Sequence, residues 1–200
     1  MSLRLLLALI SLASAPAQAL PPAPATQPKQ SSAATKAAAD RMQQKLDYLK
    51  QNSEKAKPDE RPTSLAEDEI NAYFAEGRVK LPEGLERVIF KITAGNVISD
   101  MTVNFDTLTA HSSNPLLSLF SGIHQVEVHA HGEGSGGVAR AHIDSVSLDG
   151  SEIPRFILQM FVERMLQPKY PQASLDPTFK LPERIDLVTL GEHKATVTQK

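Results

Sequence analysis

The chain has 200 residues and a formal net charge of -2 at pH 7. This small charge gives no support for a nucleic-acid-binding protein, which needs a basic face. The sequence contains no cysteine, which excludes disulfide bonds, thiol nucleophiles, cysteine metal ligands and a lipid anchor on a cysteine. The length is sufficient for one domain with its own hydrophobic core.

Residues 1–19 have the three parts of a secretory signal peptide in the right order. Arg4 gives the positive start, Leu5 to Leu12 form a short apolar segment, and Ala17-Gln18-Ala19 is a typical cleavage site. The apolar segment is too short to span a bilayer, and no later segment is long and apolar enough to do so. We therefore predict a protein of the bacterial periplasm, or a secreted one, whose mature chain begins at Leu20.

Residues 20–32 are rich in proline and predict an extended linker. Residues 33–57 predict an amphipathic helix with a narrow apolar stripe at helical spacing. The stripe consists of Ala38, Met42, Leu46 and Leu49. Because the other positions are mostly polar, we expect this helix to lie outside the core. Two interpretations remain open: the helix packs loosely on its own domain, or it docks on a protein partner.

Residues 58–200 predict one α+β domain. A helix is expected to begin at Ser64, because Ser64 and Glu67 have the spacing of a capping box. Its buried face would carry Ile70, Tyr73 and Phe74. Residues 85–93 and 97–105 then predict a β-hairpin, since apolar and polar residues alternate along them.

One phrase occurs twice, as KLPEGLERV at 80–88 and as KLPERIDLV at 180–188. Each copy precedes a predicted hairpin, and proline is tolerated there because the strand ladder has not begun. With the helix that precedes each copy, the sequence predicts two helix-plus-hairpin units, 64–105 and 153–199. Chance similarity between two strand beginnings is the alternative interpretation.

Between these units, residues 123–131 and 138–148 predict a third hairpin, joined by GEGSGG. Its glycines have the G-x-G-x-x-G spacing of a dinucleotide-binding loop. That loop must lead into a helix, whereas a second strand follows here. We therefore interpret the glycines as the tip of a hairpin.

His129 and His131 lie on one face of the first strand of this hairpin, together with Glu127. Two imidazoles and a carboxylate are a weak candidate for a zinc site. If residues 133–136 form the turn, however, His129 lies opposite Arg140, whose charge would repel a metal ion. We therefore predict a solvated face, with no metal and no other cofactor.

The most apolar stretch is SEIPRFILQMFVERMLQ, residues 151–167. Pro154 suits the first turn of a helix, and apolar residues cover most of the circumference, which is typical of a buried helix. We predict a curved antiparallel sheet of hairpins wrapped around it. The helix is either an ordinary core helix or the lining of an apolar channel that holds a lipid. The candidate lining residues are Phe156, Ile157, Met160, Phe161, Met165, Phe90, Met101 and Phe105.

Four segments within residues 64–199 carry a family resemblance: LAEDEINAYF at 65–74, LPEGLERVIFKITAGNV at 81–97, VSLDGSEIPRFILQMFVERML at 146–166 and LPERIDLVTLGEHKATVTQ at 181–199. Their order resembles that of bacterial exported envelope proteins of the LmeA type. The resemblance implies a fold like that of the tubular lipid-binding (TULIP) proteins, with a curved sheet on a helix, and a role in holding lipid. It includes no catalytic motif and does not cover the linker or the first helix.

Three functions therefore compete. The best supported is a non-catalytic periplasmic protein that binds or handles a lipid or another apolar ligand of the cell envelope. The second is a protein-interaction module of the envelope with a solid core, which docks through the helix at 33–56. The third is a metal-dependent enzyme that uses the His129 face, and it has the least support because no nucleophile elbow or strong metal set occurs.

Overall fold

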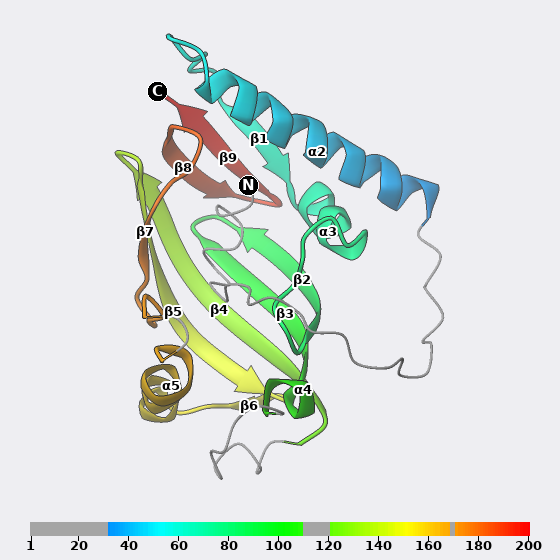
Figure 1. The fold of residues 1–200 in the computed structure, drawn as a ribbon, viewed down its shortest axis with the longest axis vertical. Helices are drawn as coiled ribbons and strands as arrows, with labels where there is room; N and C mark the ends of the chain where they lie inside the picture. Colours follow the sequence, from blue (N-terminus) through cyan, green and yellow to red (C-terminus); the bar gives the residue numbers. More distant parts are fainter. Residues whose placement is uncertain (1–31, 110–120, 169–170) are drawn as a thin grey trace.

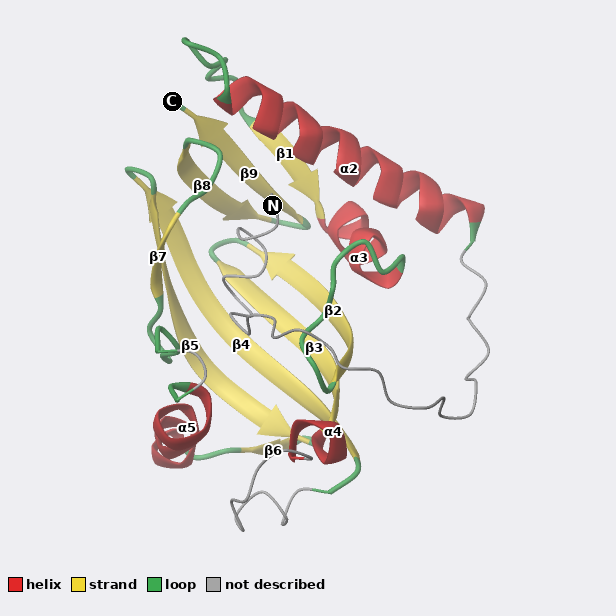
Figure 2. Ribbon diagram, in the orientation of Figure 1, coloured by secondary structure: helices red, strands yellow, loops and turns green. Residues whose placement is uncertain are grey.

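The structure, a computed structural model, describes residues 32–109, 121–168 and 171–200. An antiparallel sheet of nine strands forms its centre, and helices lie at both ends of the sheet (Figures 1 and 2). The predicted α+β class with a large antiparallel sheet is confirmed. In chain order the elements are α2 (Ala33–Ser53), β1 (Thr63–Ala66), α3 (Glu67–Ala75), β2 (Leu85–Thr93), β3 (Asn96–Asn104), α4 (Phe105–Thr109), β4 (Ile123–Ser135), β5 (Val138–Leu148), β6 (Ser151–Glu152), α5 (Arg155–Phe161), a π-helix (Val162–Leu166), β7 (Thr178–Lys180), β8 (Ile185–Gly191) and β9 (Lys194–Gln199).

Strand β4 is the centre of the sheet topology. The strands follow the order β1-β9-β8-β4-β3-β2, and β5 also pairs with β4 and carries β6 and β7. β4 pairs along its length with β3 and β5, but it pairs with β8 only where Gly134 faces Val188. The β8–β9 hairpin is therefore attached to the sheet at the tip of the long β4–β5 hairpin.

The two copies of the repeated phrase lie at the start of a hairpin, β2–β3 in the first case and β8–β9 in the second. In each copy the residue after LPE has a positive φ, 81° at Gly84 and 54° at Arg184. The next amide donates to the proline carbonyl, over 3.1 Å in the first copy and 3.0 Å in the second. A β-bulge follows in both. The two turns differ at Glu183, whose φ is also positive.

The glycine-rich segment is a hairpin tip, as predicted, but its turn has only two residues. Gly136 and Gly137 have φ of 61° and 75°, which is the backbone that a two-residue type I′ turn requires and that glycine adopts without strain. β4 therefore extends to Ser135, four residues further than predicted, whereas β5 has the predicted bounds. The register places His129 opposite Ser145, so the predicted pairing of His129 with Arg140 is wrong.

The helix α3 begins three residues later than predicted, because residues 63–66 form β1 and pair with β9. Ser64 lies inside this strand and does not cap the helix. Instead, the backbone N–H of Ala66 donates to the Glu69 carboxylate over 3.3 Å. The expected reciprocal bond between Ser64 and Glu67 therefore does not form.

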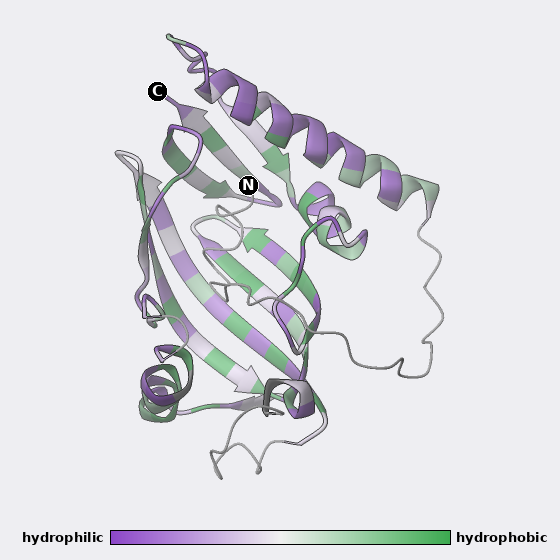
Figure 3. Cartoon of the chain, viewed as in Figure 1, coloured by the Kyte–Doolittle hydropathy of each residue, from purple (hydrophilic) through white to green (hydrophobic). Residues whose placement is uncertain are grey.

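The main core lies between α2, α3 and one end of the sheet. The helix α2 contributes to it directly, and Met42 is fully buried, with 0% exposed. The prediction that this helix lies outside the core is wrong. Its stripe is narrow, but the stripe is buried and α2 packs against α3 and β1, whereas its outward face is mostly hydrophilic (Figure 3). The core consists of Met42, Leu46, Leu49, Leu65, Ile70, Tyr73, Phe74, Val79, Val88, Phe90, Ile92, Val97, Ile185 and Val197.

The structure does not confirm a sheet wrapped around the apolar helix. None of the side chains of α5 is buried, Phe156 is 72% exposed, and Val162 is the one buried residue among the described side chains of the following π-helix. The helix follows β6, which pairs with β5 alone, and lies at the far end of the sheet from α2 (Figure 1). The helices α2 and α3 cover the sheet surface at the opposite end from α5.

Candidate functional site

One surface of the sheet, which we call the apolar face, carries alternate side chains of β2 to β5. Directly paired residues of neighbouring strands point to the same side of a sheet, so the register defines this face. For example, Met101 pairs with Val126, and Val126 pairs with Leu148. Its apolar members are Val88, Phe90, Ile92, Val97, Met101, Val103, Val126, Val128, Ala130, Ala139, Ala141, Ile143, Val146 and Leu148, and the register also places Ser99 and His124 on this face.

Burial decreases along the apolar face, away from the core. Phe90 and Val97, which contact the core, are at most 5% exposed. Toward the other end, the side chains of Val126, Val128 and Val146 are only half-buried. Apolar side chains thus continue along the sheet beyond the region that α2 and α3 bury.

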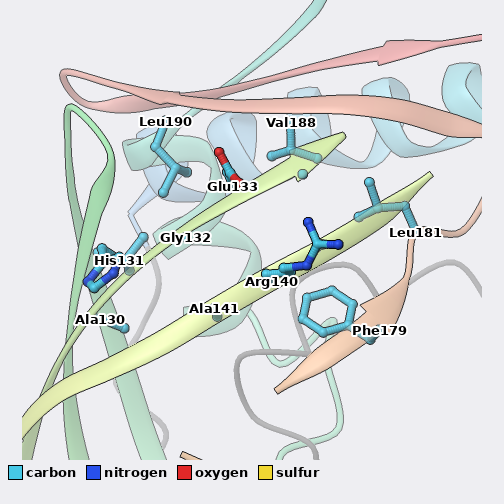
Figure 4. A pocket seen from close by; sticks show the side chains of 13 residues that line it. Ala130, His131, Gly132, Glu133, Arg140, Ala141, Phe179, Leu181, Val188 and Leu190 are labelled. Atoms are coloured by element: carbon cyan, nitrogen blue, oxygen red, sulfur yellow. The ribbon is translucent and has the colours of Figure 1, made fainter. Parts of the chain in front are cut away.

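A pocket of about 80 Å³, which we call the tip pocket, lies on the apolar face at the tip of the β4–β5 hairpin. In Figure 4, Val188 and Leu190 lie between β8 and β4, and Phe179 and Leu181 lie beside β5. Its walls are almost wholly apolar. They consist of Val97, Ala130, His131, Gly132, Glu133, Gly134, Ala139, Arg140, Ala141, Phe179, Leu181, Val188 and Leu190.

The tip pocket exists because the strands that form its floor carry glycine and alanine. A Cβ at Gly134 would lie 3.0 Å from Cβ of Val188, and one at Gly132 would lie 2.7 Å from the carbonyl oxygen of Arg140. Both positions therefore need glycine for the strands to approach as they do. Along β4 the next residue on this face after Ala130 is Val128, so the half-buried part of the apolar face begins beside the pocket.

The predicted channel residues lie in several separate places. Phe90 belongs to the core, and Met101 packs against the core from the apolar face. Phe105 lies in α4, where its ring contacts the His124 ring edge-on at 5.3 Å. Phe156, Ile157, Met160 and Phe161 lie in α5, and the side chain of Met165 is outside the described part. The structure does not bring these residues into one channel.

The opposite face of the sheet carries His129, His131 and His142. His129 pairs with the Glu127 carboxylate over 2.7 Å, and His131 with Asp144 over 2.8 Å. Asp144 is the extra residue of a β-bulge, so no alternation in the sequence indicates its position. Within the described ranges, no three histidine or carboxylate side chains converge on a point that could hold a metal ion.

A histidine–aspartate pair lies at the end of the sheet near α4. The Asp149 carboxylate contacts Nδ1 of His124 over 2.6 Å and accepts the N–H of Gln125 over 2.9 Å. The hydrogen bond to Asp149 raises the pKa of His124, and the carbonyl of Ser121 adds to this. The same bond to His124 lowers the pKa of Asp149. The pair is exposed, and the bond between the two groups favours the charged form of each.

Two further findings bear on function. Comparison of the chain with protein-family models, with curated proteins and with solved structures found no match. Across the residues that the structure describes, no helix has the length and apolar character to span a membrane.

Proposed function

We propose that this protein is a non-catalytic, exported protein of the bacterial cell envelope that binds an acyl chain of a lipid on its apolar face. The observation that carries the proposal is the half-buried stretch of the apolar face, which lies next to the tip pocket on the same face of the sheet. An apolar surface of this kind on a soluble domain is typical of a binding site.

The dimensions of the face support a ligand of this kind. From Val126 to Gly134, β4 rises by roughly 27 Å at about 3.4 Å per residue. One leaflet of a bilayer has a hydrocarbon depth of roughly 15 Å, so a membrane acyl chain can lie along the strands. The tip pocket alone, at about 80 Å³, is well below the roughly 300 Å³ of the smallest usual ligand pockets.

The sequence supports the same proposal in two ways. Residues 1–19 have the order of a signal peptide, and the pattern within 64–199 resembles lipid-binding envelope proteins of the LmeA type. The alternative, docking of a partner through the helix at 33–56, needed a free apolar stripe. Met42, Leu46 and Leu49 of that stripe lie in the core of the chain itself.

The test is native mass spectrometry of residues 20–200, purified from a bacterial periplasm without detergent. We expect a discrete added mass that solvent extraction removes and that fragments as a lipid. Bare protein that takes up no offered phospholipid would overturn the proposal.

Two neighbouring residues of β5 provide a matched pair of variants. Val146 lies on the apolar face and Ser147 on the opposite face, and both are half-buried. We expect Val146→Asn to reduce lipid retention at least several-fold, because it places an amide against the acyl chain, and Ser147→Asn to leave retention unchanged. Circular dichroism of both variants establishes that they fold.

A further inference from the structure

The tip pocket is the place where the apolar face ends. β4 pairs with β8 there, through Gly134 and Val188. Beyond it, the N–H of Leu181 donates to the carbonyl of Gly137 over 2.8 Å, and the N–H of Gly137 donates to the carbonyl of Asp186 over 3.2 Å. These backbone bonds join the β4–β5 turn at Gly137 to Leu181 and to Asp186 of β8. A molecule that lies along the apolar face therefore cannot continue past the pocket.

The lining of the tip pocket specifies which end of a ligand it can accept. Ala139, Ala141, Phe179, Val188 and Leu190 present hydrocarbon. Glu133 and Arg140 also line the pocket, but they pair with each other on the opposite face of the hairpin. Burying a charged or hydrogen-bonding head group against such walls without partners costs several kcal/mol. A terminal methyl group has no such cost.

The size of the tip pocket specifies how much of the ligand enters. Its volume of about 80 Å³ is roughly half that of the 150 Å³ apolar cavity known to hold benzene. Only the last few carbons of an unbranched chain therefore fit, and the remainder must lie on the half-buried part of the apolar face.

We infer that the tip pocket binds the methyl end of an unbranched acyl chain and thereby selects for chain length. This inference rests on the proposed function and adds the orientation of the ligand. The methyl end lies at the β4–β8 contact, and the head group lies toward the end of the sheet that carries α4 and α5.

Two substitutions change the depth of the pocket in opposite directions. Ala141→Leu adds three carbons to the floor, and Val188→Ala removes two from the wall. Each methylene of the acyl chain that is buried in the pocket, or excluded from it, changes the affinity for the fatty acid about fourfold, at about 0.8 kcal/mol per buried methylene. Ala56→Leu is the matched control, because Ala56 is exposed and does not line the pocket.

The experiment offers the folded mature protein an equimolar mixture of saturated fatty acids from about 10 to about 18 carbons, a range that brackets the depth of one leaflet. Native mass spectrometry measures which of them are retained. We expect Ala141→Leu to move the preferred length down by about two carbons, Val188→Ala to move it up by one or two, and Ala56→Leu to leave it unchanged.

The outcomes separate this inference from the proposed function. If the wild-type protein retains fatty acids but the two variants change all lengths equally, the tip pocket does not hold the chain end, and acyl binding still stands. If the folded wild-type protein retains none of them, both the inference and acyl binding are overturned.

Discussion

The two ends of the sheet each carry a helix, and the two helices are used in opposite ways. The helix α2 is mostly polar, yet Met42, Leu46 and Leu49 place it in the core. The helix α5 is apolar around most of its circumference, yet none of its side chains is buried. Burial therefore depends on whether a complementary surface is available and not on how many apolar residues a helix contains.

The helix α2 is also held by polar contacts that its apolar stripe does not predict. The Asn52 side chain, which is 0% exposed, donates to Gln199 and accepts the N–H of Asp59, both over 2.8 Å. Arg41 donates to Glu69 of α3 over 3.0 Å. At the other end, Arg155 makes exposed contacts with Asp176 and a backbone carbonyl. Exposed contacts of that kind contribute little to stability.

The largest expected effect comes from truncating one apolar residue in each helix. Met42→Ala should lower the free energy of unfolding by about 2–5 kcal/mol, because it leaves a cavity in the core. Phe156→Ala should change it by less than about 0.5 kcal/mol, because the ring is 72% exposed. Urea unfolding followed by circular dichroism measures both. Equal losses would contradict the contrast between the two helices.

The second prediction concerns the buried amide pair. Asn52→Leu removes the partner of Gln199 and of the Asp59 backbone groups, and should cost about 3 kcal/mol because buried polar groups are left unpaired. Gln51→Leu, on the exposed side of the same helix, is the control and should cost less than about 0.5 kcal/mol. A small loss for Asn52→Leu would mean that packing alone fixes the end of α2.

The third prediction uses the contact between α2 and α3. Burial would raise the pKa of Glu69, but hydrogen bonds from Lys45 and Arg41 outweigh it, and the net shift is downward. The charged carboxylate therefore stabilises the fold above its ordinary pKa of 4.5, and this contribution is lost as pH falls through the lower folded value. Glu69→Gln should cost about 1–2 kcal/mol at pH 7.

The pH dependence of the Glu69→Gln difference distinguishes a charge effect from a packing effect. The difference from the wild-type protein should disappear in acid, and unfolding curves at several pH values measure it. The exposed neighbour Asp68 is the control, since Asp68→Asn should have little effect at any pH. A difference that persists unchanged in acid would show that Glu69 acts through packing.

The hairpins were predictable because alternation is a local signal. One side of β2, β3 and β4 is apolar and the other polar, and the sequence shows this directly. The register of the β4–β5 hairpin was not predictable from the same signal. It depends on a two-residue turn at Gly136 and Gly137 and on the bulge at Asp144, each of which shifts the pairing.

Two features depend on contacts between distant parts of the chain. They are the difference in burial between α2 and α5 and the formation of the tip pocket. The strand β1 is only four residues long, and nothing in TSLA alternates strongly enough to indicate that it pairs with β9. The tip pocket requires β8 to meet β4 at Gly134. The glycines of GEGSGG were recognised as a tip, but their second role, to leave room for Val188, follows only from that contact.

The smallest expected effect concerns the end of the sheet away from α2, where the exposed pair of His124 and Asp149 joins β4 to the turn after β5. The pKa of His124 is raised above its ordinary value of 6.5 in the folded state. Its contribution to stability is therefore fully present below pH 6.5 and is lost as pH rises through the folded pKa. His124→Gln should lower Tm by about 1–2 °C at pH 5 and leave it unchanged at pH 9.

Asp149→Asn tests whether the pair acts as a unit. The two substitutions together should lower Tm at pH 5 by no more than His124→Gln alone, because each removes the same interaction. Additive losses would mean that His124 is stabilised chiefly by its contact with the carbonyl of Ser121. A loss of stability as large as the one expected for Met42→Ala would contradict the contrast between the two ends, since it would mean that the α5 end of the sheet is held as firmly as the α2 end.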